Sequence, residues 1–378
     1  MRRTIISTIG TSLLTQQIDR GNIQEKDWYD LLRDTANCKA SEIPPQVQKI
    51  ITTLKERAIA ALQQANIEAI RKASTELNGI YGIYENRLSR GKKDLHFLIA
   101  TDTIQGLTTA EIVQIFLQQQ DLYNTNIYAP SGLSTANTED FSLGIDSLLV
   151  WLQETIPPLK EQGYRINFNL VGGFKSLQGY LNTIGMFYAD EISYIFEGKN
   201  AELITIPRLP IVVDLNGLKE HTLTFALLDA GMNLTLKETK GIHETMLIEI
   251  DGQMILSTWG QLIWNQAKAE LLSGDLLAFP RLVYQDNFKR DYQQLREVKE
   301  RVKLQETLAK VSYLLQQNQG DVSVLKAHGG VQYDKYTNKG NIDHFRVTQG
   351  DRVSCHTEQG QLILHRYGRE PDVNDHPY

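Results

Sequence analysis

The sequence has little cysteine, no long apolar run and no strong excess of charge of one sign. Only Cys38 and Cys355 occur among 378 residues, which excludes a disulfide framework and fits a reducing compartment. No run of about 18 apolar residues exists, so we expect no membrane span and a cytoplasmic protein. No cysteine and histidine cluster has the spacing of a metal site, so we expect no metal or redox cofactor.

Charge and length set further limits. The net charge of −6 argues against a chain that binds nucleic acid over its whole surface. From Phe279 onward, 15 lysines and arginines stand against 13 aspartates and glutamates, so this part is the better candidate for an anionic partner. With 378 residues the chain can form two or three domains, each with its own core.

The stretch 167–176 (NFNLVGGFKS) joins an apolar alternating run to a helical pattern. The two glycines allow backbone N–H groups to approach an anion, and the following helix presents its positive end. A lysine and a serine add a charge and a donor. The same stretch also fits a tight strand-to-helix turn with a solvated lysine. The candidate ligand residues here are Gly172, Gly173, Phe174, Lys175 and Ser176.

Three other apolar runs end in a similar way, at residues 4–9, 96–100 and 126–129. Strands that alternate with helical segments predict a doubly wound α/β domain with a parallel sheet, over residues 1–210. A last pair of strands is expected at 192–196 and 202–206. Ligands bind beyond the carboxyl ends of such strands, so the endings should converge. They supply the candidates Gly10, Thr11, Ser12, Leu13, Thr101, Asp102, Thr103, Ser131 and Gly132.

Residues 18–85 form a polar, helical insertion in this domain. Within it, residues 47–77 repeat apolar positions on one face, and Pro44-Pro45 marks the start of a long helix. The apolar face either packs on the sheet or forms a surface for a partner.

Residues 211–278 predict a small winged-helix-like connector. Helices are expected at 218–229 and 261–272, with a hairpin between them that turns at Asp251-Gly252. Such modules often bind DNA, but the helix at 261–272 carries one lysine and one glutamate. We therefore favour a connector or dimer element, and DNA is an unlikely partner.

Residues 279–378 predict a small α+β domain. An amphipathic region at 287–316 precedes short strands at 343–348, 352–357 and 362–367, joined by tight turns. His344 and Arg346 share one face of the first of these strands because they are two residues apart. The other candidates for chemistry are Arg352, Arg366, Arg369, His376 and Tyr378.

These side chains suit the cleavage of an RNA phosphodiester without metal. That reaction needs a base for the 2′-hydroxyl proton, cations for the charge on the phosphate, and an acid for the leaving oxygen. Arginine meets phosphate oxygens in pairs and stays charged, and histidine or tyrosine can transfer protons. The residues alone equally fit edge strands that carry cations to prevent pairing with other sheets.

The motifs Ile9-Gly10-Thr11-Ser12-Leu13, Thr101-Asp102-Thr103 and Gly172-Gly173-Phe174-Lys175-Ser176 resemble the CARF domain of CRISPR-associated proteins. The resemblance covers about 210 residues. It implies a Rossmann-like homodimer that senses cyclic oligoadenylates.

The last ninety or so residues, from Phe288-Lys289-Arg290-Asp291-Tyr292 onward, resemble the RelE toxins, ribonucleases that cut mRNA in the ribosomal A site. Arg352 matches the arginine of that family at the scissile phosphate. His344 and Arg346 fall near two family lysines, so this chain departs from the family at its base. Arg369 follows Gly368 as the second family arginine follows a glycine. His376 and Tyr378 resemble a terminal His-Tyr pair, here interrupted by Pro377.

Together these resemblances imply a CARF–RelE effector of type III CRISPR systems. Cyclic tetra-adenylate would be its allosteric activator, and mRNA on the ribosome its substrate, cut by 2′-hydroxyl attack to leave a 2′,3′-cyclic phosphate. Two alternatives stay open. One is a ligand-gated transcription regulator with an inactive C-terminal domain. The other is a ring nuclease in which Thr11, Ser12 or Lys175 positions a 2′-hydroxyl of the ligand itself.

Overall fold

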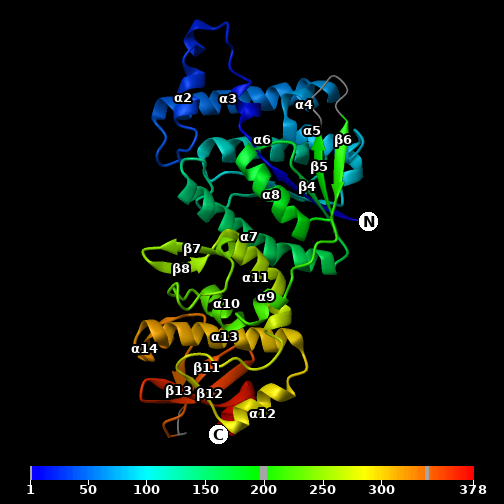
Figure 1. Cartoon of the computed structure of the whole chain (residues 1–378). Helices are drawn as coiled ribbons and strands as arrows, with labels where there is room; N and C mark the ends of the chain where they lie inside the picture. The colour runs from blue at the N-terminus through cyan, green and yellow to red at the C-terminus, as the bar shows by residue number, and fades with distance from the viewer. Residues whose placement is uncertain (1, 196–201, 337–339) are drawn as a thin grey trace. The chain divides into compact units, whose positions relative to one another are not determined.

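The computed structural model describes residues 2–195, 202–336 and 340–378 (Figure 1). The chain divides into two compact units, Met1–Ile211 and Val212–Tyr378. The expected strand at 192–196 is present to residue 195, and Phe196 lies outside the described residues.

The first unit contains a six-stranded sheet in the order β3-β2-β1-β4-β5-β6. All neighbouring strands are parallel except β5 and β6. The chain first winds from β1 to one side and then returns to the other, so β1 and β4 flank the point where the winding direction changes. The mixed α/β architecture with a parallel core is confirmed. The strands are β1 (Arg3–Thr8), β2 (Leu95–Ile99), β3 (Thr125–Tyr128), β4 (Arg165–Asn169), β5 (Glu191–Ile195) and β6 (Leu203–Pro207).

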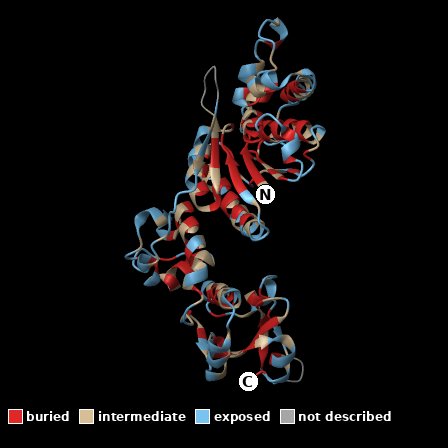
Figure 2. Ribbon diagram, turned by 90° about the vertical axis from the view of Figure 1, so that its right-hand side faces the viewer, coloured by how far each residue is buried: buried red, intermediate tan, exposed pale blue. Residues whose placement is uncertain are grey.

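Helices cover both faces of this sheet, and Figure 2 shows most of its strands as buried. Apolar residues of α1, α3, α5 and α6 share one core with Ile5 of β1. On the opposite face, Trp151 of α7 stacks on Tyr128 with ring centroids 4.5 Å apart. The helices are α1 (Ser12–Thr15), α2 (Trp28–Asp34), α3 (Pro45–Gln64), α4 (Ile67–Ala73), α5 (Thr75–Ile83), α6 (Ile104–Gln119), α7 (Thr138–Glu161) and α8 (Lys175–Tyr188), with short 3-10 turns η1 (Ile23–Glu25) and η2 (Leu88–Gly91).

The apolar repeat at 47–77 is broken into three helices. Asn66 accepts a hydrogen bond from the Ala69 amide and begins α4, and Ser74 accepts one from the Leu77 amide and begins α5. These two N-caps redirect the chain. The apolar positions still face a common core, which favours packing on the sheet over a partner surface.

The second unit begins with two short helices, a hairpin and a longer helix. Both residues of the expected turn have positive φ, 52° at Asp251 and 77° at Gly252, as a tight hairpin requires. The expected helix at 218–229 is interrupted at Glu220-His221. The elements are α9 (Asn216–Lys219), α10 (Thr222–Asp229), η3 (Glu244–Met246), β7 (Leu247–Ile250), β8 (Gln253–Leu256) and α11 (Thr258–Leu271).

The rest of this unit is built on a five-stranded sheet in the order β10-β11-β12-β13-β9. Its strands are antiparallel except for β9, which lies parallel to β13. The antiparallel order β11-β12-β13 agrees with the expected meander, but the sequence did not indicate β9. The elements are β9 (Leu282–Tyr284), α12 (Asp286–Gln294), α13 (Val298–Gln317), α14 (Ser323–Ala327), β10 (Asp334–Lys335), β11 (Asp343–Arg346), β12 (Asp351–Glu358), β13 (Gln361–Arg369) and α15 (Glu370–Asp375).

One hydrophobic core runs through the second unit. It joins Phe225 and Trp264, whose rings stack 5.5 Å apart, to residues of the sheet such as Phe345 and Leu364. The segments expected as connector (211–278) and as C-terminal domain (279–378) therefore share buried apolar residues. The three-domain division stays a prediction.

Two helical glycines of the first unit give opposite expectations for the same substitution. A Cβ on Gly144 of α7 would lie 2.3 Å from Leu133 Cα, whereas a Cβ on Gly179 of α8 would meet nothing within 4 Å. We expect Gly179→Ala to raise the free energy of unfolding by about 0.5–1 kcal/mol, since alanine is the better helix former. Gly144→Ala should lower it by roughly 1–3 kcal/mol through steric strain. Urea denaturation measures both, and a stabilising Gly144→Ala would contradict the α7 packing.

Candidate functional site

The loops that follow β1 and β4 meet at the carboxyl edge of the first sheet. A Cβ on Gly10 would lie 3.2 Å from the Gly173 amide nitrogen. Gly173 has a φ of +95°, and a Cβ there would lie 2.8 Å from Thr8 Cβ. Only glycine fits this close approach without strain. The structure therefore brings together the first and the last of the four strand endings expected to converge.

A buried carboxylate lies between these loops. Glu76 of α5 has no exposed surface, and its Oε1 accepts a hydrogen bond of 2.8 Å from the Gly10 amide. Its Oε2 accepts one of 2.8 Å from Ser74 Oγ. A Cβ on Gly172 would lie 2.4 Å from Oε1, so this position also requires glycine. No pattern in the sequence indicated Glu76, which lies in the helical insertion. In this structure the Gly10 amide donates to Glu76. The predicted role of Gly10 as a donor to a ligand stays a prediction.

The start of α8 is the open part of this edge. Its N-cap, Phe174, supplies no side-chain hydrogen bond to the first turn, which leaves that turn's amides free of a side-chain cap. Lys175 and Ser176 are exposed, and Thr11 and Ser12 at the start of α1 are partly exposed. A helix N-terminus with an adjacent lysine is suited to an anion.

The predicted site residues after β2 and β3 contact one another. Asp102 Oδ2 accepts a hydrogen bond of 3.0 Å from the Gly132 amide and pairs with Lys39 Nζ at 2.9 Å. Thr103 caps α6 through the Gly106 amide. These groups already have protein partners.

Two further members of this predicted set differ in exposure. Thr101 is buried, with its hydroxyl 2.9 Å from that of Thr103, whereas Ser131 is exposed. The Leu13 side chain is fully buried in the core, so only its backbone could reach a ligand.

Four of the predicted catalytic residues lie on one face of the second sheet. The strand register aligns His344, Ser354 and Arg366 across β11, β12 and β13, and aligns Arg346 with Arg352 in the next row. The alternate residues Phe345, Val353 and Tyr367 are buried in the core. The aligned histidine, serine and arginines therefore lie on the face of the sheet that points away from this core, which we call the outer face.

Each of three predicted arginines is held by a different carboxylate. Arg352 is 4% exposed, and its Nη2 contacts Glu370 Oε2 of α15 at 2.9 Å. Arg366 forms a fork with Asp291 of α12, at 2.7 and 3.1 Å, which raises the pKa of its guanidinium. Arg369 is exposed, and its Nε lies 3.5 Å from Asp351 Oδ1. The arginines are thus neutralised individually rather than gathered around one point.

His344 and Arg346 are less satisfied. The His344 ring packs against Tyr336 at 4.4 Å, and its pKa is lowered by burial and by the charge of Arg352. Within the described residues, neither His344 Nδ1 nor Arg346 Nε has a hydrogen-bond partner, although both atoms are buried. Buried polar atoms without a partner are uncommon in proteins.

The segment 370–378 lies over the same sheet face. Ser354 Oγ donates a hydrogen bond of 2.6 Å to the Pro377 carbonyl, and the Tyr378 ring meets His365 edge-on at 5.3 Å. Tyr378 and His376 are exposed. The sequence reasoning did not select His356, which hydrogen-bonds to His365 at 2.7 Å. Their spacing across a turn could have indicated a cross-strand pair.

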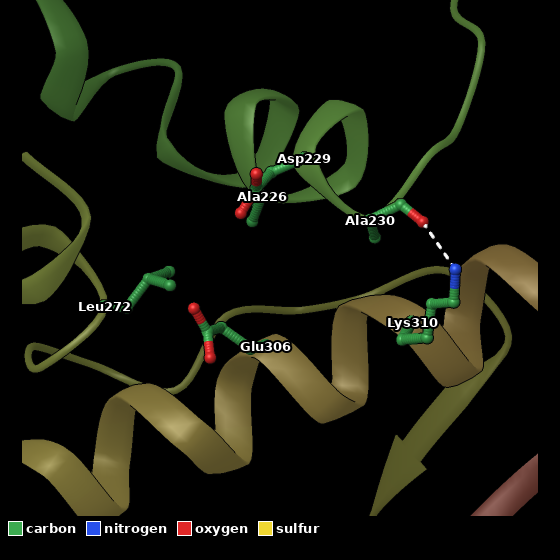
Figure 3. A pocket seen from close by; sticks show the side chains of 6 residues that line it. All are labelled: Ala226, Asp229, Ala230, Leu272, Glu306 and Lys310. Atoms are coloured by element: carbon green, nitrogen blue, oxygen red, sulfur yellow. Dashed lines mark hydrogen bonds between the residues drawn. The ribbon is translucent and has the colours of Figure 1, made fainter. Parts of the chain in front are cut away.

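Two cavities lie away from these residues. One of about 430 Å³ in the first unit is lined by residues that include Thr15, Arg20 and Tyr29. Another, of about 170 Å³ in the second unit, is lined by Asp229, Glu306 and Lys310 among others (Figure 3). Neither contains a predicted site residue. No helix within the described residues is long and apolar enough to cross a bilayer.

Comparison with known proteins gives similarities of two kinds, a family of sequences and solved structures. Residues 71–209 match a family described as "CRISPR-associated protein (Cas_APE2256)". This match indicates a CRISPR-associated protein and covers somewhat more than a third of the chain. The second kind includes a solved structure, the RelB-RelE antitoxin-toxin complex from Methanococcus jannaschii. It is 13% identical, with a TM-score of 0.17, over 25% of this chain and 95% of the other.

The ion pair between Arg352 and Glu370 supplies a test of the second site. Glu370→Ala leaves a buried guanidinium whose remaining partners among the described residues are the backbone carbonyls of Thr348 and Asp351. We expect the free energy of unfolding to fall by about 1–2 kcal/mol, measured by urea denaturation. The control Glu249→Ala removes an exposed carboxylate and should stay within roughly 0.5 kcal/mol of the parent. Equal effects of the two variants would contradict the role given to Glu370.

Proposed function

We propose that the chain is a CRISPR-associated effector that binds a cyclic oligoadenylate in its first unit and then cleaves mRNA with its second. One observation supports ligand binding above the others. The loops after β1 and β4 meet where the winding of the sheet reverses, beside the exposed Lys175 and the open first turn of α8. The residues that match the CRISPR-associated family include the second of these loops.

The ligand we propose is cyclic tetra-adenylate, bound by a homodimer. A ring with two-fold symmetry can contact the same loops of two copies of the chain in the same way. Lys175 and the amides of α8 would bind phosphate, and the hydroxyls of Thr11, Ser12 and Ser176 would supply short donors. The buried charge of Glu76 repels phosphate, so the phosphates belong on the outer, lysine side of the loops.

The reaction we propose is cleavage of mRNA on the ribosome by attack of the 2′-hydroxyl on the adjacent phosphate. The outer face of the second sheet presents arginine and histidine in adjacent rows, which suits a phosphate in its transition state. In this conformation Arg352 forms an ion pair with Glu370, and Arg366 forms one with Asp291. Substrate must displace these carboxylates, and ligand binding can assist only through different affinities for the two states.

The contacts of α11 give little support to DNA recognition by residues 211–278. The single lysine of α11, Lys268, contacts Glu306 at 3.0 Å and Asp229 at 3.4 Å. Burial alone would lower the pKa of this amine, but the two carboxylates outweigh that effect and the pKa is raised. The lysine is therefore charged but enclosed, and it is not presented to a phosphate backbone.

The ligand site is tested by Lys175→Ala. Loss of one charged donor from each copy should weaken binding of cyclic tetra-adenylate by roughly tenfold to a hundredfold, as measured by calorimetry. Lys93→Ala serves as control, because Lys93 is exposed and precedes β2 at the opposite edge of the sheet. Equal affinity of the Lys175 variant and the parent protein would remove the basis for this site.

The reaction is tested in a translating extract supplied with cyclic tetra-adenylate. Mapped mRNA ends should appear only with ligand, and Arg352→Ala should reduce the cleavage rate on the order of a hundredfold without changing ligand affinity. Arg296→Ala, an exposed arginine between α12 and α13, should cleave like the parent protein. Undiminished cleavage by the Arg352 variant would exclude this arginine from the reaction.

A further inference from the structure

Two histidines outside the predicted catalytic set form a pair on the outer face of the second sheet. His356 Nδ1 lies 2.7 Å from His365 Nε2, so one proton is shared between the two rings. The two rings are nearly parallel, with an angle of 19° between them and centroids 4.9 Å apart. His356 lies two residues beyond Ser354 on β12, so it shares the face that carries Arg352.

A β-bulge creates this pair. Ser354 lies opposite Arg366, but the next residue, Cys355, lies opposite Leu364, so His365 has no residue across from it. In a regular strand His365 and Arg366 would point to opposite faces. The bulge re-aims His365 towards His356, as bulges beside active sites often do.

We propose that His356 is the general base of the RNA cleavage and that His365 is a positioning residue that fixes its tautomer. This inference rests on the proposed function of the second unit. When His356 Nδ1–H donates to His365, the lone pair of His356 Nε2 is free. The His356 side chain is 32% exposed, so this atom can reach a substrate.

His356 Nε2 takes the proton of the ribose 2′-hydroxyl while the 2′ oxygen forms a bond to phosphorus. The bond from phosphorus to the 5′ oxygen breaks, and the 5′ oxygen leaves with the electron pair and takes the proton of the Tyr378 hydroxyl. Tyr378 then regains a proton from water, and His356 releases its proton to water.

The surroundings favour His356 over His344 as the base. His344 is packed against Tyr336, and its Nδ1 is buried.

Three groups face the histidine pair. Glu358 Oε2 lies 3.8 Å from His356 Nε2 and stabilises the imidazolium once it forms. Tyr378 lies against His365. Arg366 follows His365 in the chain but is held by Asp291.

His365 is suited to remain neutral during the reaction. Its pKa is lowered by burial and by the charge of His356, so the pair takes up one proton rather than two. His356 Nε2 takes up that proton, and His365 continues to accept the hydrogen bond from His356 Nδ1–H. The rate should therefore fall as the pH decreases through the histidine range, because a pair that is already protonated cannot act as a base.

The experiment measures RNA cleavage with cyclic tetra-adenylate between pH 5 and 8. For the parent protein the rate should rise about tenfold per pH unit and then level off. His356→Gln should lower the plateau on the order of a hundredfold or more and make the rate independent of pH over this range. His365→Phe keeps an aromatic ring but loses the hydrogen bond. It should lower the plateau while the rate still rises with pH, because His356 remains but its tautomer is no longer fixed. The control His243→Gln, in the exposed loop before β7, should match the parent.

The outcomes distinguish a failure of the histidine-pair proposal from a failure of the proposed RNA cleavage. A parent protein that cleaves no RNA with the ligand removes the proposed function itself. A parent protein that cleaves at a rate independent of pH, or a folded His356→Gln variant with the parent's rate, overturns the histidine pair alone. Thermal denaturation and ligand affinity establish whether each variant is folded. If a variant unfolds, the parent's pH profile decides.

Discussion

The carboxylate of Glu76 holds the carboxyl edge of the first sheet together. It accepts hydrogen bonds from Gly10 and Ser74, and the missing side chain of Gly172 makes room for it. A buried charge is tolerated only where hydrogen bonds replace water, so these contacts fix the loops after β1 and β4. The edge is consequently layered, with a negative charge inside and a lysine with open helix amides outside. An anion can be bound only in the outer layer.

The second sheet handles charge differently. Its outer face carries cations, and Arg352 and Arg366 there meet separate carboxylates, from α15 and α12. A buried ion pair contributes little net stability but is costly to break on one side. If the proposed function holds, a phosphate on this face replaces a carboxylate as the partner of an arginine. The free energy of that exchange is small compared with that of exposing an unpaired arginine.

Much of the first unit could be predicted from the sequence, because apolar runs that end in glycine and hydroxyl residues are local signals. The hairpin at Asp251-Gly252 was equally visible, since its turn needs positive φ. The breaks at Asn66 and Ser74 were not visible, because the apolar repeat continues across both N-caps. Glu76 was missed because it is distant in the sequence from Gly10, and only the folded chain brings the two into contact. The pairing of His365 with His356 was missed because a bulge, which changes the face on which a residue lies, leaves no trace in an alternating pattern.

The parallel pairing of β9 with β13 has a consequence for how the second unit is made. Residues 282–284 gain their sheet partners only when residues 362–364 are present, about eighty positions later. Long-range pairing of this kind must close a large loop before it is stabilised, which slows folding. On a ribosome, β9 has no partner strand until nearly the whole unit has been synthesised. The outer face, whose Arg366 lies on β13, is likewise incomplete until that strand has been synthesised.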